Sequence, residues 1–236
     1  MAICLRGFIQ MVKVMVLNDR EEWLKHRTRI GGSDASAILG ANPWKDNVRL
    51  WEEKVVNNLP PEDISDKDCV KYGVAAEPLL RELFALDHPE YQVNYVENNM
   101  WLNDKYPYAH ASLDGWLVEK STGRKGILEI KTTEILAPGQ KKKWGVPWDP
   151  ALPQNYYIQI LHYLMVTEFD FAVLNAQLKQ YYRDPEGEQI MEKSTRFCVV
   201  ERSEIEADIS YLVEKEAEFW EKVQTRKRPP LLLPDV

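Results

Sequence analysis

Two short segments of the chain carry the residue types of a metal-dependent hydrolytic site. Asp114 precedes a glycine, and farther along the chain Glu129 and Lys131 flank Ile130. Successive side chains of a β-strand alternate between its faces, so we expect Glu129 and Lys131 on one face and Ile130 in the core. Carboxylate oxygens suit Mg²⁺ or Mn²⁺. The spacing therefore predicts a divalent-metal site for phosphodiester hydrolysis.

Two predicted strands would bring these residues together. Residues 126–133 have the β-branched and apolar bias of a strand, residues 114–118 have the pattern of a neighbouring strand, and residues 121–123 supply a turn. Pairing of the strands as a hairpin would place the Asp114 carboxylate beside Glu129. The sequence leaves the register of this hairpin open.

Lys131 adds a cation to the predicted carboxylate pair. It would orient or deprotonate the attacking water, or neutralise charge that develops in the transition state. A Glu-x-Lys tripeptide also occurs as an exposed charge pair on the wet face of an amphipathic strand. The Asp-Gly pair and the apolar strand context favour the catalytic interpretation.

A predicted helix over residues 72–84 precedes these strands. Pro78 fits only a first helical turn, so Glu77 is expected at the start of the helix, as a site residue or as a partner of the helix dipole. Its expected buried stripe consists of Leu79, Leu80, Leu83 and Phe84.

A second helix is predicted over residues 154–167, after the strands. Gln159 and His162 share one face, where Gln159 is either a solvated side chain or a site residue and His162 is close enough to touch the site. The adjoining apolar face consists of Tyr156, Ile160, Tyr163 and Leu164.

Four motifs in this order resemble the bacteriophage lambda exonuclease family: Gly73-x-x-x-Glu77, Leu113-Asp114-Gly115, Glu129-x-Lys131, and Gln159 with Tyr163 on a following helix. This family, also described as YqaJ-type viral recombinases, belongs to the PD-(D/E)xK nuclease superfamily. The resemblance covers residues 23–167, and residues 23–40 resemble the family's arginine and glycine-serine motif. It implies an α/β fold with a central mixed β-sheet flanked by helices, around a restriction-endonuclease-like core.

The resemblance also implies roles for individual residues. The metal ligands would be Asp114, Glu129 and the carbonyl of Ile130. The catalytic residues would be Lys131, Glu129, Asp114, Glu77 and Gln159.

The family's pocket for a terminal 5′-phosphate would map onto Arg27, Ser33 and Ser112. A guanidinium can grip phosphate with two hydrogen bonds, and each serine hydroxyl can donate one. The spacing from Arg27 to Ser33 is one residue short, and Arg29 is a competing choice. Ser33 and Asp34 could instead cap the next helix, and Ser112 could be a strand-end hydroxyl.

By resemblance, the activity would be Mg²⁺-dependent digestion, with Mn²⁺ as a substitute, of one strand of linear double-stranded DNA from its 5′ end. Digestion would leave 3′ single-stranded tails. The family forms a ring-shaped homotrimer that encloses DNA. It works with a single-strand-annealing protein in phage or prophage recombination, in the bacterial cytoplasm. The alternatives are a structure-selective or repair endonuclease of the same superfamily, a non-catalytic DNA-binding module, and a phage structural protein.

The composition fits one intracellular domain. The 236 residues are 44% hydrophobic, enough for a substantial core, and Cys4, Cys69 and Cys198 form no metal motif, which favours a reducing compartment. We expect an N-terminal extension over residues 1–17, a nuclease domain over residues 18–225 and a mobile basic, proline-rich tail over residues 226–236. Neither a signal peptide nor a membrane span is expected.

The net charge of −7 does not by itself favour DNA binding, so the prediction depends on where the basic residues lie. These concentrate at residues 27–29 and 141–143, and the second cluster precedes Trp144 and Trp148. Cations mixed with aromatic rings suit a nucleic-acid strand, although a charge run is also typical of a solvated loop. The remaining predicted elements are a loop over residues 57–68, strands over 171–179 and 196–201 joined by a turn at 184–187, and a packing helix over 203–224.

Overall fold

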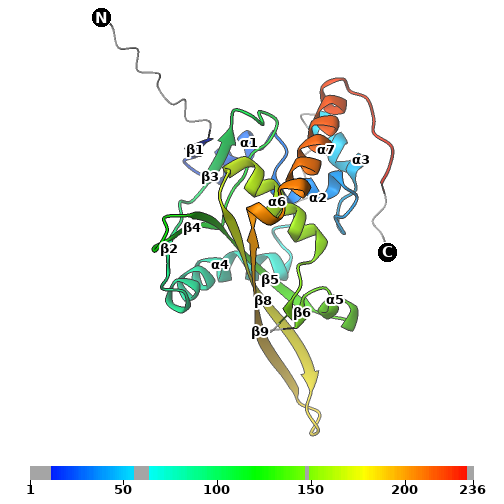
Figure 1. Cartoon of the computed structure of the whole chain (residues 1–236). Helices are drawn as coiled ribbons and strands as arrows, with labels where there is room; N and C mark the ends of the chain where they lie inside the picture. Colours follow the sequence, from blue (N-terminus) through cyan, green and yellow to red (C-terminus); the bar gives the residue numbers. More distant parts are fainter. Residues whose placement is uncertain (1–11, 56–63, 147–148, 233–236) are drawn as a thin grey trace, which may run out of the picture.

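A mixed five-stranded β-sheet forms the centre of the computed structural model, which describes residues 12–55, 64–146 and 149–232 (Figure 1). Its order is β2-β4-β5-β8-β9, in which β5 and β8 are parallel and the other neighbours are antiparallel. The strands are β2 (Tyr91–Asn94), β4 (Gly115–Glu119), β5 (Lys125–Ile135), β8 (Phe171–Arg183) and β9 (Gln189–Glu201). The predicted α/β fold with a central mixed sheet is confirmed.

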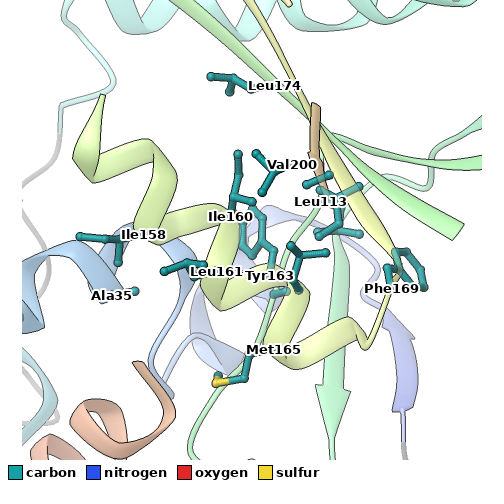
Figure 2. Close-up of a cluster of buried hydrophobic side chains, with 14 of the residues drawn as sticks. Ala35, Leu113, Ile158, Ile160, Leu161, Tyr163, Met165, Phe169, Leu174 and Val200 are labelled. Atoms are coloured by element: carbon teal, nitrogen blue, oxygen red, sulfur yellow. The ribbon is translucent and has the colours of Figure 1, made fainter. Parts of the chain in front are cut away.

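Helices cover both faces of this sheet, because its central strands are apolar on both sides. Helix α4 (Asp68–Asp87) packs on the face that carries Leu128 and Ile130. Helices α6 (Gln154–Thr167) and α7 (Glu206–Gln224) pack on the face that carries Ile127 and Leu174. Figure 2 shows side chains of α6, among them Ile160 and Tyr163, beside residues of the sheet.

Three short helices lie near the N-terminus. They are α1 (Arg20–His26), α2 (Gly32–Ile38) and α3 (Asn47–Val55). Of these, α2 packs against α6 and α7, and α3 packs against α7. Ile38 and Leu50 share a buried cluster with Phe219 and Val223 of α7. The remaining elements are β1 (Val12–Val16), β3 (Asn99–Asn103), α5 (Pro138–Lys142), β6 (Gly145–Val146), β7 (Asp149–Pro150) and η1 (Arg202–Glu204).

Both ends of the described chain are held by the fold. Strand β1, which lies within the predicted N-terminal extension, pairs antiparallel with β3. The C-terminal tail was predicted to be mobile, but Asn47 donates to the carbonyl of Pro230 at 2.7 Å and accepts from the backbone N–H of Leu232 at 2.9 Å. These two residues of the tail are thus bound to an asparagine far away in the sequence, a contact that the sequence pattern does not reveal.

Helix α4 differs from its prediction at its start. It begins at Asp68, so Pro78 lies inside the helix and Glu77 is not a boundary residue. Proline lacks an N–H, and the backbone hydrogen bond that it removes would have ended on Val74, whose side chain is exposed to solvent. The buried face is Ala76, Leu80 and Phe84, at four-residue spacing, whereas the predicted core residues Leu79 and Leu83 are exposed.

Strands β8 and β9 form a hairpin that extends well beyond the body of the molecule (Figure 1). Both strands are longer than predicted, since thirteen residues of each pair around the expected turn at residues 184–187. The predicted C-terminal helix is confirmed as η1 and α7. Cys4, Trp148 and most of the predicted loop over residues 57–68 lie outside the described residues.

Candidate active site

The β4–β5 hairpin sets the register of the candidate site. Gly115 pairs with Leu128, so the preceding residue, Asp114, lies across from Glu129. The Asp114 carboxylate accepts a hydrogen bond of 2.9 Å from the backbone N–H of Ile130. The predicted hairpin is therefore confirmed, and it brings the two predicted carboxylates to the same end of the paired strands.

Glu129 lies at the centre of a dense set of polar contacts. Its side chain is 1% exposed, and its Oε1 lies 2.5 Å from Nζ of Lys131 and accepts a hydrogen bond of 2.7 Å from Nε2 of Gln159. The same Gln159 amide also donates to the hydroxyl of Tyr163 at 2.9 Å. The buried Oε2 atom of Glu129 has no hydrogen-bond partner among the described residues. A buried carboxylate oxygen without a hydrogen-bond donor is available to bind a cation.

Glu77 approaches from the helix on the opposite face of the sheet. Burial and then the charge of Asp114 raise the pKa of the Glu77 carboxyl to about 7. Burial and then Asp114 also raise the pKa of Glu129 to about 8. Burial raises the pKa of Asp114, against the opposing effect of Lys131. These acids share one environment in which further negative charge is unfavourable.

Lys131 stays protonated in this environment. Burial by itself would lower the pKa of its ammonium, but the carboxylates of Glu129 and Asp114 outweigh that effect and raise it above its usual range. The ammonium also lies 5.3 Å from the ring centroid of Tyr156, a cation–π distance. Lys131 is thus a fixed cation of the site.

The candidate ligand atoms are carboxylate oxygens, which fit Mg²⁺ or Mn²⁺ better than a metal that prefers nitrogen or sulfur ligands. Mg²⁺ or Mn²⁺ could bind the free oxygen of Glu129 and the carboxylate of Asp114. Its positive charge would also favour the ionised forms of these two acids, whose pKa values are raised in the metal-free protein. Within the described ranges, no group of three or more His, Cys, Asp or Glu side chains converges on one point. A backbone oxygen such as the carbonyl of Ile130 would complete such a ligand set.

Two of the three residues of the predicted phosphate pocket are in direct contact. Arg27 donates to the hydroxyl of Ser33 at 2.9 Å. Its guanidinium also stacks on the indole of Trp23, 5.4 Å from the ring centroid, and the indole N–H donates to Ser112 at 3.0 Å. Arg29, the competing choice, donates instead to the carbonyl of Pro107. Trp23 therefore contacts both Arg27 and Ser112, and Arg27 in turn contacts Ser33.

The capping alternative applies to Asp34 and not to Ser33. Gly31 is the N-cap of α2, and its backbone N–H donates to Oδ2 of Asp34 at 3.1 Å. Ser33 lies inside the first turn, where its hydroxyl accepts from Arg27. The hydroxyl of Ser112 donates to the carbonyl of Asn99, the first residue of β3, and so lies beside the start of that strand.

Comparison with known proteins is consistent with this geometry. The model of the YqaJ-like viral recombinase domain matches residues 22–170. The chain belongs to this family. It is 29% identical over 214 residues to the uncharacterized protein YqaJ of Bacillus subtilis (strain 168), a match that covers 90% of this chain and 59% of YqaJ. The chain thus spans about 59% of the length of this relative.

The fold of this YqaJ-like chain is shared with solved exonuclease structures. The alkaline exonuclease LHK-Exo from Laribacter hongkongensis superposes with a TM-score of 0.56 at 16% identity, over 88% of this chain and 96% of LHK-Exo. Its complex with dAMP gives the same TM-score at 17% identity, with the same coverage. These likenesses show a common fold. Among the described residues, no helix has the length and apolar character to span a membrane.

The YqaJ-like site contains one residue, Arg81, that the sequence patterns did not single out. Tyr163 was expected on an apolar face and, by the family resemblance, together with Gln159; its hydroxyl receives a hydrogen bond from Gln159. Arg81 donates to the Glu77 carboxylate at 2.6 Å. The i, i+4 spacing of these two residues on one helix was the available signal. His162 was expected near the site, but it is fully buried and pairs with Glu216 of α7 at 2.7 Å.

The cationic segment at residues 141–143 remains a candidate contact for nucleic acid. Its lysines are exposed at the end of α5, and Lys141 donates to Gln180 of the β8–β9 hairpin at 2.8 Å. Trp144 is buried against Tyr156, with ring centroids 5.5 Å apart, and so does not offer a free stacking surface. This part of the aromatic prediction was wrong, because the indole packs into the core beside α6.

Proposed function

We propose that this chain is a metal-dependent 5′-to-3′ exodeoxyribonuclease that digests one strand of linear double-stranded DNA and leaves 3′ single-stranded tails. The observation that carries the proposal is the convergence of Asp114, Glu129 and Lys131 on adjoining strands, with Gln159 hydrogen-bonded to Glu129. Membership of the YqaJ-like viral recombinase family supports the phage-type role in recombination. The exonuclease fold supports the reaction class.

In this mechanism, Asp114, Glu129 and the Ile130 carbonyl would hold Mg²⁺, or Mn²⁺ in its place. When bound, the metal supplies an activated water and stabilises charge on the phosphoryl oxygens. Gln159 fixes the rotamer of Glu129 through its hydrogen bond at 2.7 Å. Glu77 adds a third carboxylate at the rim of the site.

Lys131 would act as a cation and not as a base in this reaction. The two neighbouring carboxylates hold its pKa above the usual range, so the ammonium keeps its proton at neutral pH. A protonated lysine beside the scissile phosphate orients the attacking water and offsets the charge that grows in the transition state.

Arg27, Ser33 and Ser112 would recognise the terminal 5′-phosphate. Arg27 is held by stacking on Trp23 and by Ser33, so its guanidinium is preorganised for an anion. The pocket would limit digestion to strand ends and set the 5′-to-3′ direction. By family membership, we further propose a ring-shaped homotrimer that encloses the duplex, a single-strand-annealing partner, and action in the cytoplasm of the bacterial host.

Digestion of matched substrates tests this proposal. With Mg²⁺, the protein should release mononucleotides from linear duplex DNA and leave nicked and covalently closed circles far less affected. Asp114→Ala and Lys131→Ala should abolish cleavage and retain binding to duplex ends. Cutting of closed circles would identify a structure-selective endonuclease, and an intact linear duplex would contradict the enzymatic proposal.

A further inference from the structure

Arg81 lies where helix α4 meets the start of strand β4, and its side chain is only 12% exposed. One guanidinium nitrogen donates to Oε1 of Glu77 at 2.6 Å. Its Nε donates to the backbone carbonyl of Asp114, also at 2.6 Å. The guanidinium carbon lies 3.5 Å from the ring centroid of Tyr95. Three contacts from three segments thus fix one cation.

These contacts join the two halves of the acidic site. Glu77 comes from a helix and Asp114 from the start of a strand, and no backbone hydrogen-bond ladder sets the distance between them. Arg81 bridges them with two donors of one rigid planar group, while the Tyr95 ring limits its rotation. The carboxylate of Glu77 is therefore held by the same guanidinium that holds the backbone carbonyl of Asp114.

Stability alone gives a weak reason for this arrangement. An i, i+4 ion pair on a helix contributes little to folding, and the Glu77 side chain is 31% exposed. The second donor of Arg81 goes to a backbone carbonyl next to a proposed metal ligand, where small displacements change ligand geometry.

We propose that Arg81 is a positioning residue of the metal site, which holds the Glu77 carboxylate toward Asp114 and fixes the backbone at Asp114. The inference rests on the proposed function for its catalytic meaning. The effect of Arg81 on the affinity for a divalent cation can be measured without DNA.

The sign of the effect on metal affinity separates positioning from simple charge. If Arg81 acted only as a positive charge near a cation site, Arg81→Met would tighten binding, because repulsion would be removed. Arg81→Lys would then leave binding unchanged. If Arg81 positions the ligands, both variants weaken binding, because lysine cannot reproduce the planar fork.

Binding of Mn²⁺ to the purified full chain, followed by electron paramagnetic resonance, gives the direct test. We expect Arg81→Met to weaken binding roughly 10- to 100-fold, the range typical of groups that orient metal ligands, and Arg81→Lys to give an intermediate loss. Binding reduces the resonance of free Mn²⁺, and Asp114→Ala should abolish this reduction. That result would show that the measurement reports binding at this site. Unchanged or tighter binding by Arg81→Met would overturn the proposal.

Two matched controls separate this role from general destabilisation. Arg124 also pairs with a carboxylate, that of Glu201, and lies 5.2 Å from the ring centroid of Phe171, away from the acidic site. Arg124→Met should leave Mn²⁺ binding unchanged. If Arg81→Met does not fold, Tyr95→Leu decides, because it removes the stacked ring and should weaken binding, whereas Tyr95→Phe keeps the ring and should not.

DNA digestion then separates the two proposals. In an active protein, Arg81→Lys should raise the Mg²⁺ concentration for half-maximal cleavage more than it lowers the rate at saturating Mg²⁺. If the wild-type protein bound Mn²⁺ at this site and cleaved no DNA, the proposed function would fail while the positioning role stood. Equal Mg²⁺ dependence of Arg81→Lys and wild type would overturn the positioning role.

Discussion

A Cβ atom added to Gly32 would lie 2.3 Å from Cε1 of Tyr163. Helices α2 and α6 therefore approach each other at a distance that only glycine permits. Ser33 of the phosphate pocket is the next residue in α2, and the Tyr163 hydroxyl receives a hydrogen bond from Gln159 beside Glu129. The close approach thus connects the candidate phosphate pocket with the candidate metal site through packed atoms.

Gly32→Ala should therefore damage both stability and activity. The Tyr163 ring is buried and cannot swing away, so we expect a loss of about 1–3 kcal/mol in the free energy of unfolding, the usual cost of overpacking. Displacement of α2 would also move Ser33 and lower the rate on 5′-phosphorylated ends. Urea unfolding and single-turnover digestion measure the two effects.

Gly139→Ala is the matched control for this substitution. A Cβ added to Gly139, in helix α5, meets no atom within 4 Å, so stability should stay within about 0.5 kcal/mol of wild type. Equal stability of Gly32→Ala and Gly139→Ala would show that α2 and α6 separate freely, and would remove the proposed connection.

Local patterns predicted the centre of the site because its residues are ordered by secondary structure. Strand alternation placed Glu129 and Lys131 on one face, and helical periodicity predicted residues 154–167 as a helix, the bounds that α6 has. The turn at residues 121–123 then brought Asp114 across from Glu129. Each of these relationships spans one element or one hairpin.

The relationships that the sequence did not reveal depend on contacts between distant segments. The tail is held by Asn47, and Arg81 reaches the carbonyl of Asp114 only when α4 packs against the sheet. The prediction from Pro78 placed the start of α4 too late. Tertiary packing of Ala76 and its neighbours outweighs the hydrogen bond that the proline removes. Propensity is a weak guide where packing decides.

Gln159→Leu tests whether the amide orients Glu129. The substitution places an apolar side chain of similar size at this buried position and removes both hydrogen bonds, to Glu129 and to Tyr163. We expect turnover to fall roughly 10- to 100-fold with a folded protein, as for other groups that orient metal ligands. Gln154→Leu, at an exposed position of the same helix, serves as the control and should keep wild-type turnover. Wild-type turnover by Gln159→Leu would show that Glu129 needs no such support.

Stability of the metal-free protein should fall as pH rises from about 4.5 to about 8. Burial and the charge of Asp114 raise the pKa of Glu77 to about 7 and that of Glu129 to about 8, from an ordinary value of 4.5. In this window the folded protein binds protons that the unfolded chain has released, so the free energy of unfolding decreases with pH. Bound Mg²⁺ favours the ionised carboxylates and should offset this loss.

The increase in melting temperature caused by Mg²⁺ is therefore expected to grow with pH. Calorimetry at about pH 6 and about pH 8.5, with and without Mg²⁺, measures this difference. Glu129→Gln removes the acid with the higher pKa and should flatten the dependence. An Mg²⁺ effect of equal size at both pH values in the wild-type protein would show that these carboxyls do not bind the metal.

Arg27→Ala should reduce the preference for 5′-phosphorylated over 5′-hydroxyl ends. Arg27 combines a hydrogen bond to Ser33 with stacking on Trp23, and a charged hydrogen bond to phosphate corresponds to a roughly 10- to 100-fold change in binding. Arg29→Ala is the matched control, because Arg29 donates to the carbonyl of Pro107 and should not contact the DNA end. Initial rates on the two kinds of end, compared within each variant, cancel general losses of activity. If Arg29→Ala changes the ratio and Arg27→Ala does not, the terminal phosphate binds at the alternative arginine.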